Sequence, residues 1–164
     1  MSFDLSQIRS YLIIPSLTSI QLYSLPAEQQ LLGTMAQESK FGTYIHQLGT
    51  GPALGIYQME VITHDSLWND FLKYKPKLSD LIMTACRFNR APVSEQLIHN
   101  LFYATIMARI HYLRTEERTK TTIPTTLAGQ ADYWDKYYNV DPVKDARVPE
   151  YIGNYNKYAK GGPQ

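Results

Sequence analysis

Residues 95–114 of this 164-residue chain read EQLIHNLFYATIMARIHYLR, the longest apolar segment with a helical period. Ser94 stands directly before it, and serine commonly caps helix N-termini. One broad face of the expected helix is almost entirely apolar and comprises Leu97, Ile98, Leu101, Phe102, Thr105, Ile106, Ile110 and Leu113. Because a face this wide is typical of a helix with neighbours on several sides, we expect residues 95–114 to form the central core helix of an α-helical domain.

Shorter helical patterns flank this segment in both directions. Pro15 is expected to stop the first helix, while Thr63 and Ser79 are expected to cap the third and the fourth. In chain order, we expect these flanking helices over residues 4–14, 26–39, 63–74, 80–88, 127–138 and 149–158.

The segments between these helices carry turn-forming residues. The glycine-rich stretch 42–57 is predicted to be a loop or a small hairpin, and the polar run 115–126 a loop. A turn is expected at residues 141–142 and an irregular tail at 161–163. Strand patterns are nearly absent, so the predicted fold class is all-α or α-rich. We expect a single domain over residues 1–164, with a core at about 20–140 and a short C-terminal extension.

Length and composition narrow the class of protein. A hydrophobic share of 44% with 19% charged residues is typical of a globular chain. The net charge of +1 argues against a general nucleic-acid-binding protein. A single cysteine, Cys86, excludes a disulfide within the chain, and no apolar run approaches the ~20 residues that span a bilayer. No basic region precedes the short apolar stretch 11–14, so we expect no secretory signal and synthesis in a cytoplasm.

The first segment with catalytic character is residues 36–41, AQESKF, which places Glu38 in the last turn of the helix expected over 26–39. A carboxylate there meets the negative end of the helix dipole and the apolar neighbours Met35 and Phe41. Both effects disfavour the charged form and raise the pKa of the carboxyl group. A raised pKa is what a general acid needs to remain protonated near neutral pH.

The second segment is residues 51–60, GPALGIYQME, at the end of the glycine-rich stretch. A glycine-led turn is expected to bring backbone close to a ligand. Tyr57 offers a stacking ring, Gln58 an amide that both donates and accepts, and Glu60 a carboxylate 22 positions after Glu38. Two carboxylates that flank a cleft are the requirement of glycoside hydrolysis.

Together, the helix ending in Glu38-Ser39-Lys40-Phe41 and the following Gly55-Ile56-Tyr57-Gln58 resemble the lysozyme-like superfamily. The likeness is to soluble lytic transglycosylase domains and goose-type lysozymes, and most closely to phage-encoded domains of this kind. It covers about residues 25–68 and the later helices loosely. Residues 47–55 and 136–140 depart from the family's pattern.

The resemblance implies a lysozyme-like fold and a peptidoglycan-degrading enzyme that cleaves the β-1,4 bond between N-acetylmuramic acid and N-acetylglucosamine. It implies no cofactor and no metal, and the expected partner is a peptidoglycan glycan strand, with neither nucleic acid nor membrane. We expect a monomer made in a host cytoplasm that acts on the cell wall after release or as part of a virion. The catalytic candidates are Glu38 and Glu60, and the candidates for substrate binding are Ser39, Tyr57, Gln58, Tyr138 and Asn139.

Several alternatives stay open at this point. A lytic transglycosylase needs only Glu38, whereas Glu60 occupies a position where goose-type lysozymes carry an acid. The residues also allow Glu60 to be a helix-start carboxylate, and Glu38 to be paired with Lys40 or Arg109.

Two further alternatives concern the aromatic residues and the activity itself. The cluster of Tyr133, Trp134, Tyr137 and Tyr138 fits a sugar-stacking wall as well as core packing. A non-catalytic phage structural or wall-binding protein that retains the fold is the alternative function. No His-x3-His or His-Glu-x2-His spacing predicts a metal site.

Overall fold

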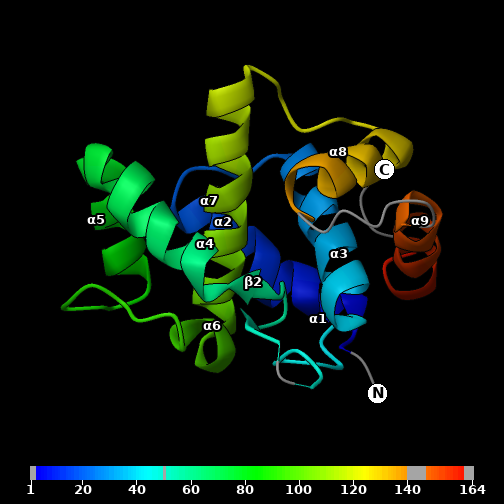
Figure 1. Ribbon diagram of the computed structural model, residues 1–164, viewed down its shortest axis with the longest axis horizontal. Helices are drawn as coiled ribbons and strands as arrows, with labels where there is room; N and C mark the ends of the chain where they lie inside the picture. Colours follow the sequence, from blue (N-terminus) through cyan, green and yellow to red (C-terminus); the bar gives the residue numbers. More distant parts are fainter. Residues whose placement is uncertain (1–2, 50, 140–146, 161–164) are drawn as a thin grey trace.

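The computed structural model describes residues 3–49, 51–139 and 147–160. Helices dominate these residues, and the predicted α-rich fold class is confirmed (Figure 1). Among the described residues, no helix is both long and apolar enough to cross a bilayer. The turn expected at residues 141–142 and the tail expected at 161–163 lie outside the described residues.

The N-terminal half contains one hairpin and a series of helices, some of them with π or 3-10 turns. Its elements are α1 (Leu5–Ile8), a π-helical turn (Arg9–Ile13), α2 (Ile14–Ser19), α3 (Leu25–Ser39), β1 (Ala53–Leu54), β2 (Met59–Glu60), α4 (Val61–Ser66), a second π-helical turn (Leu67–Phe71) and a 3-10 turn (Leu72–Tyr74). The C-terminal half is helical, with α5 (Pro76–Ala85), α6 (Gln96–His99), α7 (Leu101–Thr119), α8 (Leu127–Tyr137) and α9 (Arg147–Tyr158).

The central helix is α7, as the apolar pattern predicts. Ile106, Met107 and Ile110 are fully buried on it, and α2, α3 and α6 all contact it. Figure 1 shows α7 running through the middle of the molecule, with α5 on one side and α3, α8 and α9 on the other. The buried apolar residues of these elements form one cluster.

The prediction of a single helix over residues 95–114 is wrong in two respects: the helix is interrupted near its start, and it continues beyond residue 114. The chain breaks at Asn100, whose backbone is extended and whose side chain accepts a hydrogen bond from the Tyr103 N–H at 3.0 Å. Asparagine competes with the helical backbone in this way, so it separates α6 from α7. Helix α7 then continues to Thr119 and ends at Lys120, which adopts the left-handed conformation. The loop expected over 115–126 therefore starts five residues later.

The prediction that Pro15 stops the first helix is also wrong, since helical structure continues to Ser19. A π-helical turn directly precedes the proline, and in it the Ile14 N–H donates to the carbonyl of Arg9, five residues back. Proline has no N–H and its ring collides with the carbonyl four residues earlier in an ordinary helix. A wider turn at this point accommodates the ring without ending the helix.

Other boundaries shift by a few residues. Helix α4 begins at Val61 and not at Thr63, and α5 begins at Pro76, where proline suits the first turn of a helix. The predicted helices over 26–39, 127–138 and 149–158 match α3, α8 and α9 to within one or two residues. Of the two forms expected for the stretch 42–57, a loop or a small hairpin, the structure has a hairpin, with Ala53 opposite Glu60 and Leu54 opposite Met59. Its second strand lies beyond residue 57.

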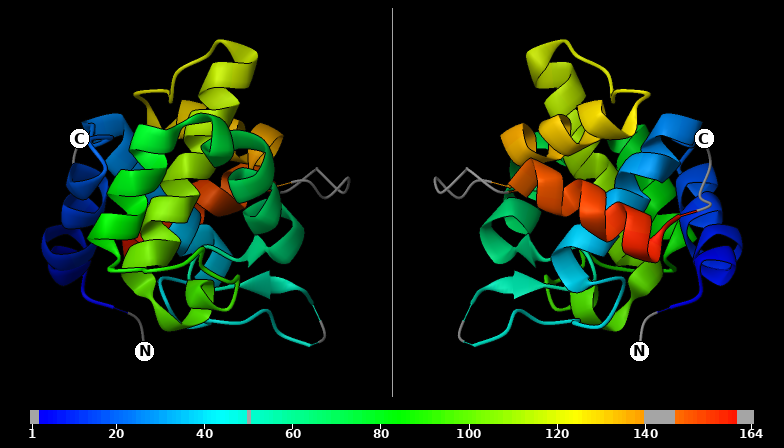
Figure 2. Two further views of the ribbon diagram at one scale, coloured as in Figure 1. Left: turned by 90° about the vertical axis from the view of Figure 1, so that its left-hand side faces the viewer. Right: turned by 90° about the vertical axis from the view of Figure 1, so that its right-hand side faces the viewer.

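Helices α3, α8 and α9 pack against one another (Figure 2). A side-chain carbon at Gly33 in α3 would collide with the ring of Tyr151 in α9, so the glycine allows the two helices to approach closely. This packing brings the start of α9 next to the C-terminal end of α3, where Lys40 and Glu150 form an ion pair.

Candidate active site

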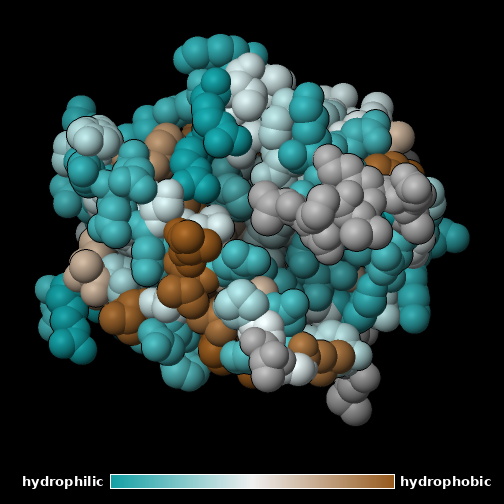
Figure 3. All heavy atoms as spheres, viewed as in Figure 1, coloured by the Kyte–Doolittle hydropathy of each residue, from teal (hydrophilic) through white to brown (hydrophobic). Residues whose placement is uncertain are grey.

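A cleft of about 890 Å³ lies where the C-terminal end of α3, the hairpin, α7 and the end of α8 meet. Figure 3 shows this face of the molecule: it is largely hydrophilic, with an apolar group over α4, the helix on which Val61 and Ile62 are exposed. Five of the seven predicted site residues line the cleft, namely Glu38, Gln58, Glu60, Tyr138 and Asn139.

Glu38 is held at the cleft by a residue from another helix. It occupies the last turn of α3 and is half-buried. The indole Nε1–H of Trp134, in α8, donates a hydrogen bond to Glu38 Oε1 at 2.8 Å. Trp134 is itself 2% exposed and its ring lies 5.3 Å from that of Tyr151, so the indole that orients Glu38 is anchored in the core.

The pKa of Glu38 is shifted in the direction the sequence predicts. Burial raises it from the ordinary 4.5 to about 7, against the opposing effects of the indole hydrogen bond and the positive charges of Lys40 and Arg147. The raised pKa favours the protonated form of the carboxyl group closer to neutral pH, as a general acid requires.

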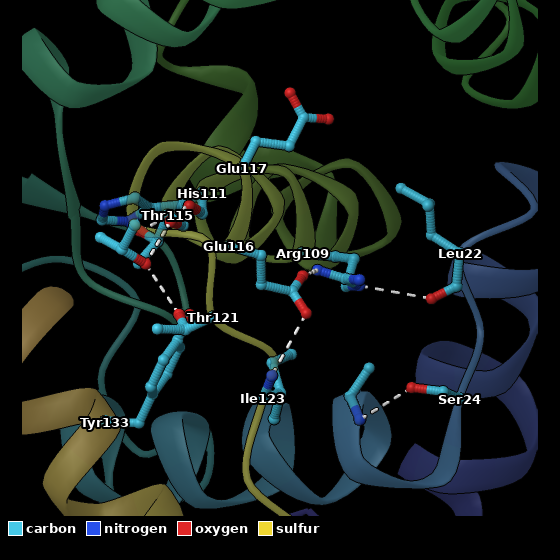
Figure 4. Close-up of polar contacts among 12 residues, drawn as sticks. Leu22, Ser24, Arg109, His111, Thr115, Glu116, Glu117, Thr121, Ile123 and Tyr133 are labelled. Carbon is cyan, nitrogen blue, oxygen red and sulfur yellow. Dashed lines mark hydrogen bonds and ion pairs between the residues drawn. The ribbon is translucent and has the colours of Figure 1, made fainter.

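The two basic residues considered as ion-pair partners of Glu38, Arg109 and Lys40, pair with other acids. Arg109 donates to Glu116 Oε2 at 2.8 Å and to the carbonyl of Leu22, and Figure 4 shows this pair with the Ile123 N–H, which also binds Glu116. Lys40 Nζ contacts Glu150 Oε1 at 3.1 Å. Both basic side chains thus have carboxylate partners other than Glu38.

Ser39 does not line the cleft, contrary to the expectation that it binds substrate. Its side chain is fully buried, donates to the carbonyl of Met35 at 3.0 Å and accepts from the Gly42 N–H at 3.0 Å. The next three residues, Lys40 to Gly42, all have positive φ. A left-handed run of this kind ends a helix abruptly, and the Ser39 hydroxyl binds backbone groups on both sides of the turn.

Tyr57 also lies in the core rather than at the cleft. It is 1% exposed, and its hydroxyl accepts from Thr105 Oγ1 at 3.4 Å. The close backbone approach expected of the glycines occurs at Gly55, but toward the protein itself. Gly55 has φ of +74°, and a side-chain carbon there would collide with the carbonyl of Leu97. Gly55 and Tyr57 therefore pack the hairpin against the core and do not contact the cleft.

Gln58 follows directly and lines the cleft. Its backbone is also left-handed, with φ of +46°, and its Nε2 donates to the carbonyl of Gly55 at 2.7 Å. The amide oxygen of Gln58 is not used in that bond, so it remains an acceptor for a ligand.

Glu60 lies at the end of the hairpin, half-buried, and lines the same cleft as Glu38. It is the residue before α4, as the helix-start interpretation requires. Within the described part of the chain, however, its carboxylate makes no capping hydrogen bond to that helix. The hairpin register places Glu60 opposite Ala53. Glu38 and Glu60 thus come from separate elements and line the same cleft.

The aromatic cluster divides between the two roles considered for it. Tyr133 and Trp134 are buried in the core, whereas Tyr137 and Tyr138 line the cleft. Tyr138 is 9% exposed, and its hydroxyl donates to the carbonyl of Tyr57 at 2.8 Å. Tyr138 therefore connects the end of α8 to the hairpin, and little of its side chain is exposed to the cleft.

Three residues of α7 also line the cleft and were not among the predicted site residues: His111, Arg114 and Arg118. Their spacing of three and four residues places them on one helix face. That spacing is visible in the sequence, but an apolar core helix gives no sign of which of its polar residues meet a cleft.

No three His, Cys, Asp or Glu side chains gather as a metal site within the described ranges. No protein-family model matches this chain, and comparison with curated proteins and with solved structures finds no similar protein.

Proposed function

We propose that this protein cleaves the β-1,4 glycosidic bond between N-acetylmuramic acid and N-acetylglucosamine in peptidoglycan, with Glu38 as the general acid. The observation that carries the proposal is the state of Glu38. Its carboxyl group lines a cleft large enough for sugar rings, is oriented by Trp134 and has its pKa raised to about 7. A structural carboxylate normally has an ion-pair partner, and two candidate partners of Glu38, Lys40 and Arg109, are paired with other acids.

The first chemical step follows from these groups. Protonated Glu38 donates its proton to the glycosidic oxygen as the bond between that oxygen and the muramoyl C1 breaks. Positive charge develops at C1 and on the ring oxygen, while Glu38 becomes a carboxylate. The Trp134 indole N–H stabilises that carboxylate by a hydrogen bond that strengthens as the charge forms.

Two endings are consistent with the residues of the cleft. In a transglycosylase, the Glu38 carboxylate takes the proton of the muramoyl C6 hydroxyl, and O6 bonds to C1 to close a 1,6-anhydro ring. In an inverting hydrolase, Glu60 takes a proton from water, which bonds to C1 from the opposite face of the sugar. Glu60 lines the cleft, so the second ending is available.

The proposal is tested by digestion of purified peptidoglycan with the wild-type protein, Glu38→Gln and Glu60→Gln, followed by mass spectrometry of the products. We expect cleavage by the wild type and none by Glu38→Gln. Products lighter by one water molecule identify the transglycosylase, and Glu60→Gln then remains active. Reducing ends identify the hydrolase, and Glu60→Gln is then inactive.

Two results would contradict the proposal. Full activity of Glu38→Gln would show that the acid is another residue. No cleavage of walls of several chemical types by the folded wild type would favour the alternative of a non-catalytic wall-binding protein. Because glutamine retains an oxygen that accepts from Trp134, the Glu38→Gln variant removes the acid and keeps this hydrogen bond.

A further inference from the structure

The basic side chains of α7 introduce a second kind of chemistry into the cleft. Arg114 and Arg118 lie one helical turn apart and both line it, next to His111. The acidic groups of the cleft come from other elements: Glu38 from α3, Glu60 from the hairpin and Glu150 from α9. Positive charge in the cleft is thus concentrated on the α7 surface and at Lys40.

Arg114 and Arg118 differ from several other basic residues in that neither forms an ion pair among the described residues. Arg9, Lys40, Lys75 and Arg109 each contact a carboxylate within 4.0 Å, whereas no such contact is found for Arg114 or Arg118 among the described residues. Arg114 donates one hydrogen bond through Nη1 to Ser66 Oγ at 2.9 Å, and Arg118 is exposed. Among the described residues, most guanidinium donors of the pair therefore have no carboxylate partner.

Two further observations describe the surroundings of Arg114 and Arg118. Burial and the proximity of Arg118 lower the pKa of Arg114, and Asp70 offsets this only in part. The buried Nδ1 atom of His111 has no hydrogen-bond partner among the described residues. Burial, Arg114 and Arg118 together lower the pKa of His111 to about 3, so the ring is neutral and adds a polar atom without a charge.

A guanidinium group binds a carboxylate through two parallel N–H···O bonds, and two adjacent guanidinium groups favour one anionic group between them. An anion bound instead near Glu60 or Glu150 would be repelled. The α7 side of the cleft therefore favours an anionic group of a ligand, and the sides that carry Glu60 and Glu150 do not.

We propose that Arg114 and Arg118 form a carboxylate-binding subsite that holds the side chain of the muramoyl residue during glycan recognition. This inference rests on the proposed function for the identity of the sugar. The carboxylate has two sources: the lactyl group of a peptide-free glycan, or the stem peptide where the lactyl carboxyl is bonded to it. Chitin oligosaccharides have the same β-1,4 linkage and no carboxylate.

The test measures affinity by calorimetry in the Glu38→Gln background, so that the ligand is not consumed. The three ligands are peptide-free muramoyl–glucosamine oligosaccharides, their peptide-bearing forms and chitin oligosaccharides of equal length. Arg118→Gln is the main variant because the side chain is exposed and its loss should not affect folding. Arg114→Gln is the second variant. Arg90→Gln, an exposed arginine that does not line the cleft, is the control for net charge.

We expect Arg118→Gln to weaken binding of a muramoyl ligand by about tenfold, because it removes the charge-assisted hydrogen bonds to the carboxylate. Chitin affinity and the Arg90→Gln control should not change. Weakening confined to the peptide-free ligand identifies the lactyl carboxylate, and weakening confined to the peptide-bearing ligand identifies the stem peptide.

The subsite is overturned if Arg118→Gln weakens chitin and muramoyl ligands equally, if it weakens neither, or if no muramoyl ligand binds. These results are separate from the failure of the proposed function. Carboxylate selectivity without cleavage by the wild type would remove the enzymatic proposal and leave the subsite. Cleavage by the wild type with unchanged selectivity in Arg118→Gln would remove the subsite and leave the enzymatic proposal.

Discussion

Trp134 Nε1 lies 2.8 Å from Oε1 of Glu38, a hydrogen bond between residues 96 positions apart in the chain. An indole nitrogen donates and cannot accept, so Oε1 must be the accepting oxygen. When Glu38 is protonated, its proton is therefore favoured on Oε2, because a carbonyl oxygen accepts the indole N–H better than a hydroxyl oxygen does. Helix α8 thus biases which oxygen of a carboxyl group on α3 delivers a proton.

Replacing this donor should change the acidity of Glu38. In Trp134→Phe the carboxylate loses a hydrogen bond that stabilises its charged form, so we expect the pKa of Glu38 to rise by on the order of one unit. Since the protonated form is the acid, the alkaline limb of the pH–rate profile should move to higher pH, while the maximal rate falls because the orientation is lost. NMR titration of Glu38 measures the shift directly.

Trp68→Phe is the matched control for that experiment. Its indole also donates a 2.8 Å hydrogen bond, to the hydroxyl of Tyr103, and Trp68 does not line the cleft. An unchanged or lowered Glu38 pKa in Trp134→Phe would contradict the assigned role of the indole.

Glu38 should also make the stability of the fold depend on pH. Its pKa is about 7 in the folded protein and 4.5 when unperturbed, so folding favours the protonated form. The stabilising contribution is complete below about pH 4.5 and is lost as pH rises through 7, up to about 3 kcal/mol. Glu38→Gln cannot ionise, so it should be more stable than the wild type at pH 8 and equally stable at pH 4.

Urea denaturation at the two pH values checks this prediction without an activity assay. Glu60→Gln retains Glu38 and should therefore keep the Glu38-dependent loss of stability between pH 4 and pH 8. Equal stability of the wild type and Glu38→Gln at pH 8 would mean that the carboxyl group is not destabilised by burial.

The hairpin should depend on glycine at position 55. Gly55→Ala introduces a side-chain carbon at φ of +74° and into the carbonyl of Leu97, so we expect a loss of about 2 kcal/mol or more. Gly49→Ala has a similar φ of +78°, but the new carbon meets nothing within 4 Å among the described residues. It should lose only about 1 kcal/mol. Thermal unfolding of both variants compares the two effects, and equal losses would exclude the close approach to Leu97.

The hydroxyl of Tyr138 should stabilise the hairpin from the other side. Tyr138→Phe removes the donor to the carbonyl of Tyr57, and we expect a loss of about 1–3 kcal/mol because a buried acceptor is left without this partner. Tyr11→Phe is the control, since that ring is 75% exposed and the same change there should fall within about 0.5 kcal/mol. Denaturant titration of the two variants gives the comparison, which fails if their losses are the same.

The parts of the fold that the sequence predicts are those that depend on neighbouring residues, such as helix caps and apolar periodicity. Ser24 and Thr126 cap α3 and α8 through their own side chains, and the apolar stripe of α7 shows that it lies at the centre of the core. The break at Asn100 and the π-helical turn before Pro15 were missed, because an asparagine cap and a widened turn each depend on a balance between alternative backbone hydrogen bonds.

The candidate site divides in the same way. The sequence by itself places the Glu38 carboxyl group in the last turn of an apolar helix and predicts the direction of its pKa shift. The burial that raises this pKa to about 7 comes from the packed fold. Only the tertiary structure decides that Trp134 donates to it, that Ser39 and Tyr57 are in the core, and that Arg114 and Arg118 meet the cleft. The physical reason is that periodicity specifies which face of an element is apolar, whereas the contacts between distant elements depend on how those faces pack together.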